Sequence, residues 1–141
     1  MIEALEISKQ LAAVLNSGQF SQEFTAAARA LPEYDLAQLK SLAVSVVPKS
    51  AEIVNLTRAV TNLEIEVDVA LQKKVSKDLD GDVEELLKLV SEIVKFLNRK
   101  DISGAKFKKI ANEPIYSSEH LNEKRLFTSL ITVTYSRILT K

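Results

Sequence analysis

The sequence predicts an α+β domain in which two helices cover one face of a curved antiparallel sheet. An amphipathic segment at 80–99 needs a partner surface, and a regularly alternating segment at 63–72 provides one. Strands that follow one another through short turns pair antiparallel. The chain has 141 residues, the size of one domain, and its three glycines and three prolines form no linker, so we expect a single domain over 1–141.

The first helix is expected at 2–16, where apolar residues recur at helical spacing. Asn16-Ser17-Gly18 would stop it, with glycine in the left-handed conformation. Residues 19–31 fit a strand or a helix, and we favour the strand. Leu31-Pro32 then breaks regular structure, because proline disfavours the helical region for the residue before it, and one helical turn can follow at 35–39.

Alternation of apolar and polar residues predicts the next strands. Residues 42–47 read as a buried strand that ends in a turn at Pro48-Lys49-Ser50, and residues 51–58 alternate more weakly.

The clearest strand, 63–72, has one wholly aliphatic face, and its other face carries the carboxylates of Glu64, Glu66 and Asp68. A slip of one residue in its pairing would bury these carboxylates at a cost of several kcal/mol each. The register of this strand is therefore strongly specified.

The central helix, 80–99, is amphipathic and should pack on that aliphatic face. Asp80 or Asp82 can cap its first amides, and Arg99 and Lys100 lie at its last turn, as the helix dipole favours. Its buried face is predicted to consist of Val83, Leu86, Leu87, Val90, Ile93, Val94 and Leu97.

The last third of the chain reads as strands. A turn at 101–104 leads to an extended segment at 107–116, where Pro114 indicates an edge strand or a bulge. Residues 117–123 form a polar loop or a single turn, and 127–135 alternate as a final long strand rich in β-branched residues.

Composition narrows the functional class. Nineteen basic and nineteen acidic residues cancel, so a broad electrostatic footprint for nucleic acid is not indicated. Cysteine is absent, which excludes disulfides, thiolate metal sites and a cysteine nucleophile. The chain starts with acids where a secretory signal has lysines, and no apolar run approaches the roughly eighteen residues that span a bilayer. We expect a soluble intracellular product with no membrane partner.

Two segments resemble chemical sites only superficially. His120 is the single histidine, and without a second ligand we interpret it as a solvated loop residue. The aspartates at 78–82 resemble a calcium loop, but the glycine comes two positions early, and Leu89 stands where a bidentate glutamate is required. Helix capping explains these aspartates better. We therefore expect no catalytic, metal or cofactor site, and no cofactor.

Two charged clusters remain as candidate subunit-interface residues. Glu64, Glu66 and Asp68 in a regular row are typical of a solvated face, or of one that a neighbour's lysines complement. Lys106, Lys108 and Lys109 flank Phe107 and are more typical of a lysine-protected edge strand than of a single-strand binding site. With strands this long for a small domain, the pattern favours copies that extend their sheets or contact one another in a ring.

Several blocks resemble a family of small tailed-phage structural proteins over about residues 19–136. Members have LPEYDL, V-x-V-P, PIYS-x-EHL and F-x-S-x-x-T-x-T-Y at places that correspond to LPEYDL at 31–36, the segment ending at Pro48, PIYSSEHL at 114–121 and FTSLITVTY at 127–135. The element order is also similar to that of tail terminators and neck proteins.

The resemblance implies a curved sheet against two helices, and a homohexameric ring between the tail tube and the head connector or stopper. DNA would pass through that ring without specific binding, and the protein would reside in the virion after assembly in the host cytoplasm. The loops at 48–51 and 101–106 would be candidates for contact with the next ring.

Three alternatives remain open. The first is another neck, tail completion or minor tail assembly protein that does not close a ring. The second is a nucleic-acid-binding protein that uses the lysines at 106–109, and the third is a small hydrolase that uses the carboxylates of 64–68. A non-enzymatic virion component is the preferred prediction.

Overall fold

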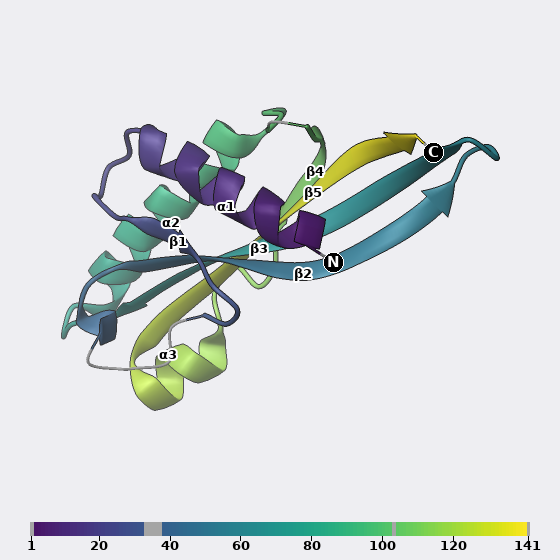
Figure 1. The fold of residues 1–141 in the computed structure, drawn as a ribbon. Coiled ribbons are helices and arrows are strands. Elements are labelled where there is room, and N and C mark those ends of the chain that lie inside the picture. The colour runs from purple at the N-terminus through teal and green to yellow at the C-terminus, as the bar shows by residue number, and fades with distance from the viewer. Residues whose placement is uncertain (1, 33–37, 103, 141) are drawn as a thin grey trace.

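A computed structural model describes residues 2–32, 38–102 and 104–140, and within them an open five-stranded sheet is packed against helices (Figure 1). This confirms the predicted α+β class. The elements in chain order are α1 (Ile2–Ser17), β1 (Ala26–Ala28), the 3-10 turn η1 (Gln38–Lys40), β2 (Ala43–Asn55), β3 (Val60–Lys74), α2 (Leu79–Leu97), β4 (Lys106–Asn112), α3 (Ser118–Lys124) and β5 (Leu126–Thr140).

The strand order is β1-β2-β3-β5-β4. The four long strands pair antiparallel, as predicted, whereas β1 lies parallel to β2 and makes the sheet mixed. The favoured strand at 19–31 is confirmed only for Ala26–Ala28. The helical turn predicted at 35–39 falls mainly on residues outside the described ranges, and η1 begins at Gln38.

The main core lies between the sheet and the two long helices. Figure 1 shows α1 and α2 on one side of the sheet and α3 on the other, near the start of β5. The aliphatic face of β3 is fully covered, with Leu63, Ile65, Val67, Val69 and Leu71 each at most 1% exposed. The predicted register of this strand is therefore confirmed.

Helix α2 buries most of its predicted face. Leu86, Val90, Ile93 and Leu97 are buried, and the other three predicted positions pack against the core while partly exposed. Leu89, which the prediction left out, is completely buried. The buried stripe is therefore wider than predicted, because α2 contacts both the sheet and neighbouring segments of the core.

The cap of α2 lies two residues before the nearer of the two predicted cap residues. Asp78 is the N-cap, and its carboxylate accepts a hydrogen bond from the Gly81 amide at 3.2 Å, whereas Asp80 and Asp82 lie inside the first turn. Asp82 instead accepts 2.6 Å hydrogen bonds from the amide and the hydroxyl of Ser76. These two hydrogen bonds hold the pKa of Asp82 below its ordinary value of 3.8.

Asp82→Asn is expected to lower the stability of the protein near neutral pH and to have little effect in strong acid. A carboxyl whose folded pKa is depressed stabilises the fold above its unfolded pKa, and that stabilisation is lost as the pH falls through the folded pKa. Unfolding midpoints of the wild-type protein and the Asp82→Asn variant, measured from pH 7 to pH ~2, would show this pH-dependent difference in stability. Asp80→Asn is the matched control, since it removes a first-turn charge that is not bonded to Ser76. Equal pH profiles for the two variants would contradict the assignment.

Strand β2 does not end in a turn at Pro48, so that prediction is wrong. The strand continues to Asn55, with a bulge between Pro48 and Ser50 that leaves Lys49 as the extra residue. Proline is tolerated here because, in the described ranges, β2 has no outer neighbour beyond its short pairing with β1. The true hairpin turn comes later, where the Leu56 amide donates to the Val60 carbonyl at 3.0 Å.

Other boundaries shift modestly. Helix α1 ends at Ser17, and Gly18 does not adopt the predicted left-handed conformation. The small size of Gly18 matters instead, because a Cβ there would lie 2.8 Å from the Phe20 ring.

Strand β4 ends at Asn112, before Pro114, and the predicted loop after it contains helix α3. Strand β5 extends beyond its predicted end to Thr140.

The far ends of β2, β3 and β5 project past both long helices, which is clear in Figure 1. We refer to residues 49–62 with residues 136–140 as the arm. Helices α1 and α2 do not cover the whole width of the arm.

Candidate assembly surface

The carboxylates of Glu64, Glu66 and Asp68 lie on the face of β3 turned away from α1 and α2, which we call the open face. All three side chains are partly exposed. Thr132 Oγ1 donates to Asp68 Oδ1 at 2.6 Å, and Ser50 Oγ donates to Glu66 Oε1 at 3.1 Å. The hydroxyls of neighbouring strands therefore orient two of the three carboxylates, and the predicted acidic row is present.

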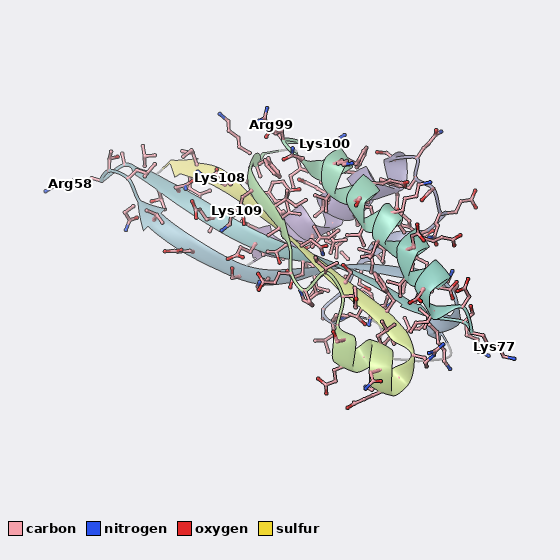
Figure 2. All side chains as sticks on the ribbon, turned by 180° about the vertical axis from the view of Figure 1, so that it is seen from behind. Arg58, Lys77, Arg99, Lys100, Lys108 and Lys109 are labelled. Atoms are coloured by element: carbon pink, nitrogen blue, oxygen red, sulfur yellow. The ribbon has the colours of Figure 1, made fainter. Side chains whose placement is uncertain are left out.

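The lysines lie on β4, the last strand of the sheet, which confirms the predicted edge strand. Lys106 is opposite Ser136 and Lys109 is opposite Thr134. Opposed residues in an antiparallel pair share a face, so both lysines belong to the open face. Lys108 is the extra residue of a bulge. All three lysines are exposed, and Figure 2 shows Lys108 and Lys109 on β4.

The structure brings the acidic and basic clusters onto one surface without joining them. Strand β5 lies between them, so that Glu64, Ser136 and Lys106 form one cross-strand row. Two strand spacings of roughly 4.8 Å separate the ends of such a row. Among the described residues, none of these lysines forms an ion pair with these carboxylates. Both sets of charges are therefore accessible to a partner.

The arm adds an apolar surface that the sequence prediction missed. Every residue from 49 to 59 is exposed. On β2 and its turn, Ile53 and Leu56 are each 56% exposed and Val54 is 37% exposed. Ile138 of β5, also 56% exposed, lies in the same cross-strand row as Val54. The signal was present as apolar residues at 53–56, but the turn assigned at Pro48 separated them from a strand.

An exposed ion pair joins helix α1 to the base of the arm. Arg137 Nη1 lies 3.8 Å from Glu6 Oε2 of α1, and both side chains are more than one third exposed. An exposed ion pair of this length contributes little to stability. The pairing of β3 with β2 and β5 extends through the arm to Asn55 and Thr140, and Leu139 packs against the core.

His120 is not the solvated loop residue that the sequence predicted. It lies in α3, is partly buried, and its Nδ1 is 3.0 Å from the hydroxyl of Thr128. The Ser117 hydroxyl caps this helix by accepting a hydrogen bond from the His120 amide. His120 thus helps to attach α3 to β5.

Two of the blocks that resemble phage proteins form one structural unit. The block at 114–121 leads into α3, and the block at 127–135 forms most of β5. The Ser117 amide donates to the Thr128 carbonyl at 2.9 Å, and the rings of Tyr116 and Phe127 are 6.0 Å apart. These blocks therefore have packing roles. The LPEYDL block falls largely at 33–37, outside the described residues.

The two loops expected to contact a neighbouring ring have different outcomes. Residues 48–51 form the bulged part of β2, so their assignment as a loop is wrong. Residues 101–106 connect α2 to β4, where Ile102 and Ala105 form an isolated bridge. Asp101 is exposed, and its carboxylate accepts a 2.9 Å hydrogen bond from the Phe107 amide.

The chain matches no protein-family model, and no curated protein matches it. Within residues 2–32, 38–102 and 104–140, no three acidic or histidine side chains lie close enough together to hold a metal ion. In the same described ranges, no helix is both long enough and apolar enough to cross a bilayer.

Proposed function

We propose that this chain is a structural subunit of a tailed-phage virion, specifically a tail terminator whose copies form a ring of about six subunits. The ring would join the tail tube to the head connector or stopper at the neck, and DNA would pass through it. The protein would be a non-enzymatic component of the mature virion, assembled in the host cytoplasm.

The sequence blocks support the lineage in this proposal. Their resemblance to small tailed-phage structural proteins covers about residues 19–136. The fold agrees with what that resemblance implies, because a curved sheet lies against two long helices. Packing roles for the blocks at 114–121 and 127–135 fit a shared scaffold better than a shared catalytic centre.

The arm is the observation that carries the assembly role. A strand that is exposed along residues 49–55, with apolar side chains on both faces, is a poor surface for an isolated monomer. Ile53 lies on the helix side of the arm and Val54 on the open face. Burial of both faces requires contact with another chain, and an assembly of repeated subunits supplies that contact.

Purified protein mixed with tail tubes from the same source is expected to seat on tube ends as a ring, which negative-stain electron microscopy would detect. The double variant Ile53→Glu with Val54→Glu should prevent ring formation, because it places charges on both faces of the arm. Glu84→Gln on α2 is an exposed control. A monomer that ignores the tubes would overturn the terminator assignment and favour another neck or tail completion role.

A further inference from the structure

The sheet has two different free edges. β1 covers β2 only opposite residues 44–46, so within the described part of the chain residues 49–55 of β2 have no strand on their outer side. At the other edge, β4 pairs with β5 on one side and, among the residues that the structure describes, with no strand on the other. A contact that joins these two edges is heterologous, since each copy contributes a different surface. Repetition of such a contact produces a closed ring or a filament.

Strand direction permits the two edges to pair. Three successive antiparallel pairings make β2 and β5 run one way and β3 and β4 the other. If a second copy is placed beside β4 in the same orientation, its β2 lies antiparallel to β4. This pairing would continue the antiparallel pattern of the sheet. The free backbone N–H and C=O groups of both edges would then hydrogen-bond to each other.

The charges of the two edges are complementary. Glu52 of β2 is opposite Glu64, so it lies on the open face with Lys106 and Lys109. Within one chain, three strand spacings of roughly 4.8 Å separate Glu52 from these lysines. In a sheet continued across two copies, one spacing separates them, and the carboxylate can reach an ammonium group of the neighbour.

Asp101 limits where this pairing can begin. Its carboxylate already accepts a hydrogen bond from the Phe107 amide. Residues 108–112 are therefore the part of the β4 edge that is available to a partner strand. Lysines 108 and 109 at the start of that stretch protect a lone subunit from random edge pairing. A partner strand that carries a carboxylate can pair with these lysines, and Glu52 supplies that carboxylate.

We propose that residues 49–53 of one copy pair antiparallel with residues 108–112 of the next, with Glu52 opposite Lys109. This inference rests on the proposed function, since it specifies how the subunits of that ring meet. The occupant of each edge is a second copy of this chain, and the lysines of β4 are its recognition residues.

Cysteine cross-linking tests the contact directly, because the native chain contains no cysteine. Glu52→Cys and Lys109→Cys proteins are mixed in equal amounts and treated with a mild oxidant or a short bis-maleimide. A covalent dimer is expected only in the mixture. Lys109→Cys mixed with Glu84→Cys, an exposed position on α2, is the matched control and should remain uncross-linked.

Charge exchange provides a second readout that does not depend on cysteine chemistry. Glu52→Lys is expected to weaken self-association by at least about fivefold, and Lys109→Glu on the same chain should restore it. Both positions are exposed, so unfolding midpoints near the wild-type value would show that the variants fold.

Each outcome has a distinct meaning. Rings that form without the mixed cross-link would overturn the edge pairing while leaving the proposed function intact. Cross-linking of Glu52→Cys with itself would show that two β2 edges meet, which also overturns the pairing. A protein that never associates, alone or on tail tubes, would overturn both proposals.

Discussion

Val67→Asp is expected to leave the protein largely unfolded. Val67 is completely buried at the centre of β3, between Pro48 and Val133 of the neighbouring strands. An unpaired carboxylate there costs several kcal/mol, a large part of the roughly 5–15 kcal/mol that stabilises a domain. Far-UV circular dichroism and urea titration at pH 7 would measure the loss.

The adjacent residue provides the control for that substitution. Asp68→Asn changes the side chain on the open face and can retain its contact with Thr132, so stability should change by less than about 1 kcal/mol. If both variants lost the same stability, the assignment of opposite faces to Val67 and Asp68 would be wrong.

Ile93→Ala should destabilise the protein by roughly 2–5 kcal/mol through lost burial and the cavity that remains. Ile93 is completely buried in the stripe by which α2 covers the core. Chemical denaturation at equilibrium would give the change in the free energy of unfolding.

Leu87→Ala should cost less than Ile93→Ala, because Leu87 is only partly buried. Lys88→Ala, at an exposed position of the same helix, should be nearly neutral. A near-neutral result for Ile93→Ala itself would show that a different face of α2 is buried.

The sequence was most informative where one physical pattern dominated. Strict alternation at 63–72 determined both faces of β3, because a slip of register would have buried Glu64, Glu66 and Asp68. The helical spacing at 80–99 likewise identified α2 and most of its buried residues. For these elements, local pattern and tertiary packing agree.

The prediction failed where tertiary context decided the structure. Pro48 reads locally as a turn, yet β2 passes through it, because an edge strand with a bulge can accept proline. Leu89 lies outside the predicted stripe, and its burial depends on contacts that a single helix does not reveal. The Asp78 cap was displaced because several nearby aspartates could serve as caps.

The candidate surface was predictable only in part. Glu64 and Glu66 on one strand, and the lysines of β4 at an edge, followed from alternation and composition. Their shared open face depends on the strand order, with β5 inserted between β3 and β4, which the sequence does not reveal. The apolar arm was missed for the same reason as the continuation of β2.

Native mass spectrometry of the purified wild-type protein tests whether the chain assembles into a ring. We expect a discrete species with a mass close to six times the 15.6 kDa of one chain, which the Ile53→Glu, Val54→Glu variant fails to form. A wild-type protein that stays monomeric at every concentration, including in the presence of tail tubes, would show that the chain does not form a ring.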